Sequence, residues 1–217
     1  MTKLGASQTQ QSSGGRTASR APLTRLAGPL ALAAGVLMVV VEVVIFPIVD
    51  RDDHVGTSTN SVYRVSGVVY FLAFCLLVLA AVAAYTWQAH KAGRFGVVGL
   101  FGALVGTMFL GGDLWFETFY VTYVADIAPE VLDADPAGMI VIGAVSSYLL
   151  FAIGWALFGL ASFRAGVFPR AICVAIVIGG LVGFQSLLPP FGIVLGLAMI
   201  WLGIWMIRTP GASEVVS

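Results

Sequence analysis

The sequence predicts an all-α protein, a polytopic bundle of membrane-spanning helices, and three observations support this prediction. Of the 217 residues, 59% are hydrophobic and only 10% are charged. The mean hydropathy is +0.98. The apolar residues also gather into runs long enough for helices to cross about 30 Å of hydrocarbon. Such a chain is too apolar for a soluble domain and too long for a single anchor.

The chain divides into a tail, an apolar region and a second, shorter tail. Residues 1–26 are rich in Ser, Thr, Gln and Gly, contain four basic residues and no acid, and predict a disordered cytoplasmic tail. Residues 27–208 form the predicted transmembrane domain, and residues 209–217 a short cytoplasmic tail. Six transmembrane helices are expected, at about 27–48, 62–87, 95–119, 139–162, 171–188 and 191–207.

The last two predicted helices are short and are separated by Pro189 and Pro190. Proline lacks the N–H that would continue a helix, so the pair ends one helix and starts the next. We expect a tight helical hairpin whose turn lies at the membrane surface.

The basic residues predict the orientation of the chain. Nine of them fall in the N-terminal tail, in 88–94, in 163–170 or at the C-terminal end, which a six-span path puts on one side. Only Arg51 and Arg64 fall on the other side. Because basic residues favour the cytoplasmic side, both termini are predicted to be cytoplasmic. The Gly- and Ala-rich composition favours a multi-pass protein of a bacterial plasma membrane, the inner membrane.

Asp113 and Glu117 are two acids near the end of an otherwise apolar run. Residues four apart share one face of a helix. The same face contains Gly102 and Gly106, a spacing that lets a second helix approach closely. Both carboxylates are therefore expected to point into the bundle, with Asp113 one turn deeper than Glu117.

Two further charged residues are expected at the same outer level. Glu42 lies on a stripe of small residues in the first span, and Arg64 enters from the outer end of the second. We predict that both converge with Asp113 and Glu117 on an outward-facing acidic pocket. The polar side chains expected to line this pocket at similar height are Tyr63, Tyr70, Ser146, Ser147 and Gln185.

The predicted cluster holds three carboxylates against one guanidinium. Like charges in a low-dielectric site cannot all stay ionised cheaply, so either a carboxylate is protonated or a cation shares the site. Two interpretations stay open. The pocket binds a proton, a metal ion or an amine, as in a small binding or transport protein. Alternatively, the charges fix helix packing in a structural or accessory subunit of a membrane complex.

Catalysis is the least favoured class of function. The sequence has no His-rich zinc motif, no Gly-x-Ser-x-Gly nucleophile and no phosphate-binding loop. No catalytic residue and no cofactor are predicted apart from a bound cation, and the identity of any metal stays open. The expected surroundings are lipid, with a membrane-protein partner or a second copy as candidate partners and no nucleic acid.

The stretch "GLFGALVGTMFLGGDLWFETFYVTYVADIAPEVLD", residues 99–133, carries one resemblance. It resembles bacterial six-span integral membrane proteins in which a Gly-rich helix ends in a Trp-x-Glu-x-Phe motif followed by a Pro-Glu segment. That group has no assigned activity. The resemblance therefore implies the six-span layout and transfers no catalytic or binding residue.

Overall fold

The computed structural model describes residues 22–132, 134, 138–185 and 188–209, which form helices and no strand. Most of the two predicted tails, residues 1–21 and 210–217, lies outside the described residues. The all-α prediction is confirmed. The main helices are α1 (Pro22–Ile45), α2 (His54–Thr59), α3 (Ser61–Trp115), α5 (Gly138–Ala165), α6 (Arg170–Val182) and α7 (Ile193–Arg208).

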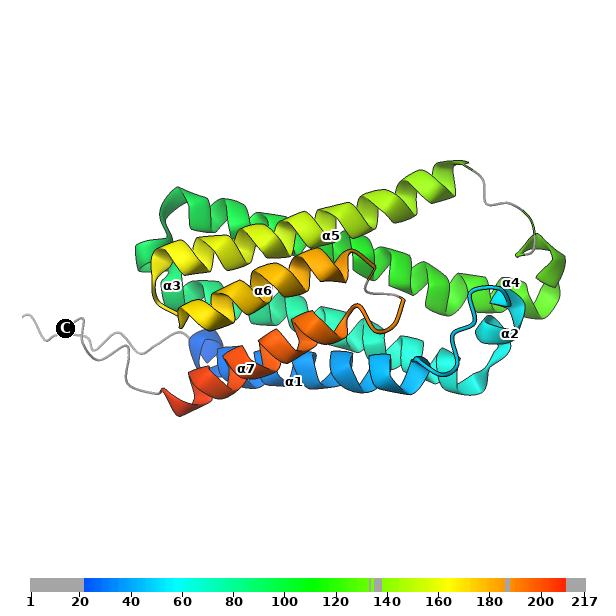
Figure 1. Ribbon diagram of the computed structural model, residues 1–217, viewed down its shortest axis with the longest axis horizontal. Coiled ribbons are helices and arrows are strands. Elements are labelled where there is room, and N and C mark those ends of the chain that lie inside the picture. Colours follow the sequence, from blue (N-terminus) through cyan, green and yellow to red (C-terminus); the bar gives the residue numbers. More distant parts are fainter. Residues whose placement is uncertain (1–21, 133, 135–137, 186–187, 210–217) are drawn as a thin grey trace, which may run out of the picture.

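The long element α3 is two helices joined by a reversal at Gly93. This glycine has φ 55° and ψ −157°, a backbone conformation that residues with a Cβ rarely adopt. The chain therefore turns back there, and the two halves of α3 lie alongside each other (Figure 1). The turn between α5 and α6 and the end of α7 lie at this same end of the bundle (Figure 1).

Three helical stretches are long and apolar enough to cross a membrane, namely Thr24–Ile45, Ser61–Ile127 and Gly138–Ala165. The second of these includes the reversal at Gly93. Two shorter apolar helices, Arg170–Gln185 and Ile193–Arg208, complete the bundle. Large apolar side chains are exposed on the outside, with Met108 67% and Val65 66% accessible. A face of this kind suits hydrocarbon better than water, so the fold is compatible with a membrane protein.

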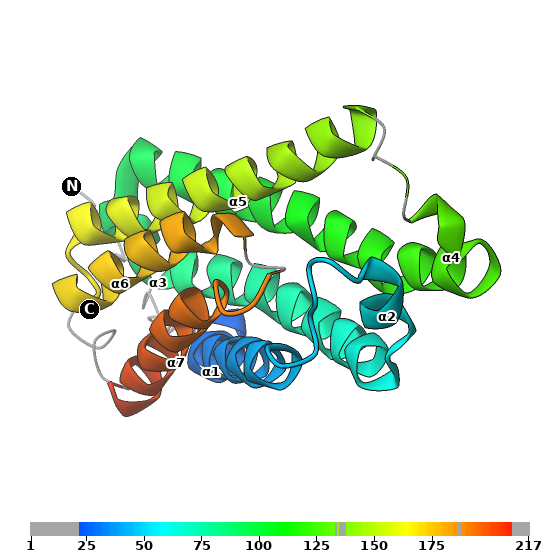
Figure 2. The ribbon, with the colours of Figure 1, turned by 45° about the vertical axis from the view of Figure 1, so that its right-hand side comes forward.

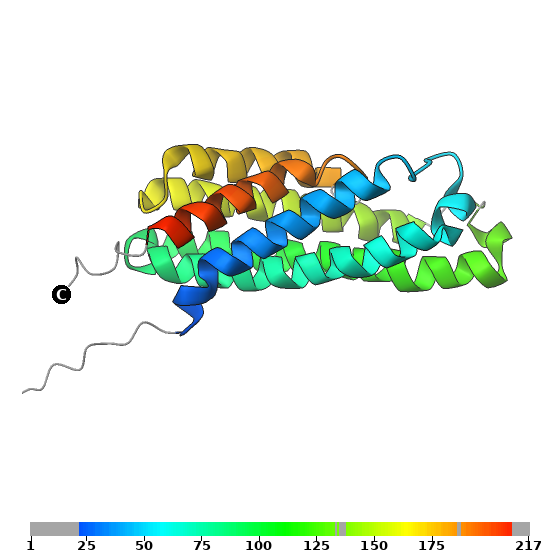
Figure 3. The ribbon, with the colours of Figure 1, turned by 90° about the horizontal axis from the view of Figure 1, so that it is seen from below.

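Glycine allows the helices to pack closely. A Cβ on Gly106 would lie 2.6 Å from the Cα of Phe151, and one on Gly102 would lie 3.2 Å from the Cα of Gly154. The close approach predicted for Gly102 and Gly106 is thus confirmed, and the neighbour is α5. On the other side of the bundle, Gly35 packs against the backbone of Gly196, which brings α1 onto α7 (Figure 3).

The helix that contains Asp113 continues beyond residue 119, where the sequence predicted its end. It passes through a π-helical segment, η1 (Phe116–Val121), into α4 (Thr122–Ile127). Within it the hydroxyl of Thr122 donates 2.7 Å to the carbonyl of Thr118. The extension packs against α2 (Figure 2), which covers it and explains why it does not end with the apolar run.

The helices α6 and α7 form a hairpin, and in the described part of its turn Pro189 is buried while Pro190 is exposed. Both helices stop before the ends of α3 and α5 (Figure 1). The reason is length. The 13 residues of α6 reach only about 20 Å at 1.5 Å per residue, so the longer neighbours continue past the turn.

Candidate functional site

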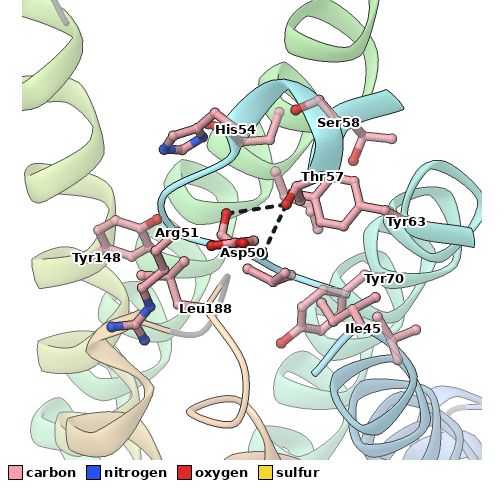
Figure 4. A pocket seen from close by; sticks show the side chains of 16 residues that line it. Ile45, Asp50, Arg51, His54, Thr57, Ser58, Tyr63, Tyr70, Tyr148 and Leu188 are labelled. Carbon is pink, nitrogen blue, oxygen red and sulfur yellow. Dashed lines mark hydrogen bonds between the residues drawn. The ribbon is translucent and has the colours of Figure 1, made fainter. Parts of the chain in front are cut away.

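A cavity of about 350 Å³ lies above this turn, at the end of the bundle opposite the reversal at Gly93. The cavity lies where α1 and the α6–α7 hairpin have ended, beside the parts of α3 and α5 that extend further. We call it the tyrosine cavity (Figure 4). Its lining consists of Val41, Ile45, Val49, Asp50, Arg51, His54, Thr57, Ser58, Tyr63, Gly67, Tyr70, Leu114, Glu117, Thr118, Tyr148 and Leu188.

The segment between α1 and α3 covers one side of the cavity and is tied down by short polar contacts. Asp53 caps α2 by accepting a 2.7 Å hydrogen bond from the N–H of Gly56. The hydroxyl of Thr57 accepts from the N–H of Asp50 at 3.0 Å and donates to its carbonyl at 3.3 Å (Figure 4). These bonds place Asp50 and Arg51 at the cavity.

The opposite wall is built by the start of α3 and by η1. Asn60 caps α3 by accepting from the N–H groups of Val62 and Tyr63, as expected for an N-cap asparagine. Gly67 allows η1 to approach, since a Cβ there would lie 2.6 Å from the hydroxyl oxygen of Thr118. The π-helical turn beside it is a type of irregularity frequent at functional sites.

Three tyrosines and one carboxylate define the chemistry of the cavity. Tyr63 and Tyr70 come from α3 and Tyr148 from α5 (Figure 4). Glu117 comes from η1 and lines the same cavity. Glu117 interacts electrostatically with both Tyr63 and Tyr148. Asp113 does not line the cavity, but it is half-buried and interacts with Tyr148 in the same way. The wall therefore presents aromatic rings beside negative charge.

Glu42 is buried beneath this wall, with 0% of its surface accessible. The hydroxyl of Tyr70 donates a 2.5 Å hydrogen bond to Oε1 of Glu42. Among the described residues, no group bonds to the other oxygen, Oε2. Gly192, just before α7, packs so closely that a Cβ there would collide with Oε1 of Glu42 and the hydroxyl of Tyr70.

The structure does not place Arg64 with the three predicted carboxylates. Its guanidinium forms a bidentate pair with Asp126, at 2.6 and 3.0 Å, and also donates to the carbonyls of Ser58 and Thr122. Arg64 does not line the cavity. The helix that continues through η1 into α4 places Asp126 next to the guanidinium, which binds it. Asp126 is not among the residues predicted for the pocket, and no sequence signal paired it with Arg64.

The predicted lining residues have different outcomes. Tyr63 and Tyr70 line the cavity. Ser146 is half-buried and Ser147 is buried, and both hydroxyls donate to the carbonyl of Gly143. Gln185 lies in the 3₁₀ turn after α6 and does not line the cavity among the described residues.

Sequence reasoning missed Tyr148 and the residues between α1 and α3. Tyr148 follows Ser147 directly, so choosing the serines selected the adjacent face of α5. Asp50, Arg51 and His54 are not among the residues predicted to line the pocket. Only the structure shows that this segment lines the cavity. The periodicity of a sequence does not indicate contacts between segments that are far apart in the chain.

The described residues contain no group of three or more His, Cys, Asp or Glu arranged to hold a metal ion. No family model, curated protein or solved structure shows a significant match to this chain. Fold and site together thus define an all-helical protein of membrane type with a tyrosine-lined, acid-bearing cavity.

Proposed function

We propose that this chain is a multi-pass plasma-membrane protein that binds a small cation in the tyrosine cavity, as a binding or transport protein. The observation that carries the proposal is the juxtaposition of Glu117 with the rings of Tyr63, Tyr70 and Tyr148 around one cavity. A carboxylate in a poorly solvated site favours a positively charged partner. Tyrosine faces add cation–π attraction, so an ammonium group suits this wall well.

The proposed topology has six spans, with both termini in the cytoplasm and the cavity opening outward. Counting the two halves of α3 separately, successive helices run in alternating directions along the bundle (Figure 1). Lys91 and Arg94 flank the reversal at Gly93, and Arg164 and Arg170 flank the α5–α6 turn. Basic residues at this end support a cytoplasmic location for it.

A ligand-binding measurement tests the function. Benzylammonium, rubidium and manganese ions would each be added in excess to the full-length protein in detergent or nanodiscs. Binding raises the melting temperature, because a ligand that binds only the folded state stabilises it. We expect the largest rise with benzylammonium, and we expect Glu117→Gln to remove it.

The matched control is Glu130→Gln, which makes the same chemical change at an exposed acid away from the cavity. This variant should respond to benzylammonium like the parent. If no probe shifts the parent, or if Glu117→Gln responds fully, cation binding in the tyrosine cavity is wrong. The role of a structural or accessory subunit would then take its place.

A further inference from the structure

We propose that Glu42 is a proton-binding site, separate from the cation site at Glu117, which exchanges its proton with the tyrosine cavity through the hydroxyl of Tyr70. The inference does not depend on cation binding at Glu117. It rests on the burial of Glu42, on the short hydrogen bond that it accepts from Tyr70 and on the position of Tyr70 between the carboxylate and the cavity.

The energetics favour an uncharged Glu42 at neutral pH. An ionised carboxylate without a charged partner in a dry interior costs several kcal/mol even after relaxation of the protein. A neutral acid leaves at most one O–H or oxygen unsatisfied, which costs about 1–3 kcal/mol. Oε2 has no hydrogen-bond partner in the described part of the chain, so ionisation of Glu42 would leave part of the negative charge unsupported there.

Among the described residues, the groups that face Glu42 offer no countercharge. From α3 the titratable group is Tyr70, and from the segment before α7 the neighbour is the backbone of Gly192. Glu117 and Tyr63 lie around the cavity, while Arg64 is bound to Asp126. Uptake of a proton is therefore the available way to neutralise this carboxylate.

Tyr70 provides the route, because it lines the cavity and also donates to Oε1. In the exchange, a hydronium ion in the cavity gives a proton to the Tyr70 oxygen while the original phenolic hydrogen moves to Oε1. One O–H bond forms on each of these two oxygens, and one breaks in the hydronium ion and one in Tyr70. The products are a neutral Glu42 acid, an unchanged phenol and water.

Proton uptake at Glu42 would also affect the packing of a neighbouring helix. Gly192 packs against both Oε1 of Glu42 and the hydroxyl of Tyr70, and it directly precedes α7. A change in the charge or bonding of Glu42 therefore acts on the start of α7. This contact gives the protonation state of Glu42 a direct connection to the α6–α7 hairpin.

Infrared difference spectroscopy during a pH titration of the full-length protein tests the proposal. A protonated side-chain acid gives its own C=O band, and we expect one such band to be lost in Glu42→Gln and kept in Glu117→Gln. Loss in Glu117→Gln alone would overturn the assignment to Glu42. A Glu42→Gln spectrum identical to that of the parent would do so as well.

Tyr70→Phe keeps the test decisive if Glu42→Gln does not fold. It removes the hydroxyl and retains the ring. The Glu42 band should move to higher frequency because the acid loses a hydrogen bond, and proton uptake after a pH jump should slow several-fold. Unchanged frequency and unchanged uptake would exclude Tyr70 as the route. Tyr63→Phe, at another cavity tyrosine, should change neither measurement.

Discussion

The guanidinium of Arg64 lies 2.6 Å from the carboxylate of Asp126 and joins the first half of α3 to the helix that continues its second half. The side chains are 32% and 52% accessible, so water and salt screen the pair. The pair therefore connects α3 and α4 at the periphery of the bundle. It does not supply the countercharge of the cavity.

Asp126→Asn should lower the melting temperature slightly at low salt, and high salt should reduce the difference. Arg64→Ala should cost more, because it also removes the bonds to the carbonyls of Ser58 and Thr122. Thermal unfolding in detergent at two salt concentrations measures both effects. Neither variant should alter benzylammonium binding, and a strong loss in Arg64→Ala would show that Arg64 acts on the cavity after all.

Arg51 is the only Lys or Arg among the described residues that line the tyrosine cavity. A positive charge there repels a cationic ligand, so Arg51→Gln should tighten benzylammonium binding by up to about fivefold, the scale of an exposed charge interaction. Titration at low salt measures the change. Arg25→Gln, at the start of α1, serves as the control. Weaker binding in Arg51→Gln would instead mean that the arginine helps to form the site.

Substitutions at two glycines of α3 distinguish the effect of close helix packing on stability from the effect of helix propensity. Gly106 meets the backbone of α5, whereas a Cβ on Gly112 would have no heavy atom within 4 Å. Gly106→Ala should destabilise the protein by about 1–3 kcal/mol through overpacking. Gly112→Ala should be neutral or gain up to about 1 kcal/mol, because alanine favours the helix. Equal melting temperatures for the two variants would contradict the close α3–α5 contact.

Single-cysteine labelling tests the six-span topology. In a background lacking Cys75 and Cys173, cysteines at the exposed positions Asp52 and Glu130 should react with an impermeant thiol reagent on intact cells. A cysteine at Lys91, also exposed, should react only after permeabilisation. Labelling of Lys91→Cys from outside, with protection of the other two, would reverse the proposed orientation.

The sequence by itself determined the all-α class and the close-packed glycine face at Gly102 and Gly106. Both follow from local rules, namely the length of apolar runs and the repeat of the helix. The hairpin after α6 was predictable for the same reason, since Pro189 and Pro190 stop a helix wherever they occur. Their positions along two helices also put Glu117, Tyr63 and Tyr70 at one level, and all three line the tyrosine cavity.

Only the tertiary structure decided which groups meet. Asp126 reaches Arg64 because a π-helical turn extends the helix past residue 119, and the segment between α1 and α3 meets the cavity through the bonds of Thr57. The burial of Glu42 under Tyr70 and Gly192 depends on three segments far apart in the chain. Helical periodicity gives the face that a side chain occupies, but the helix ends and the packing of neighbouring elements determine its partner.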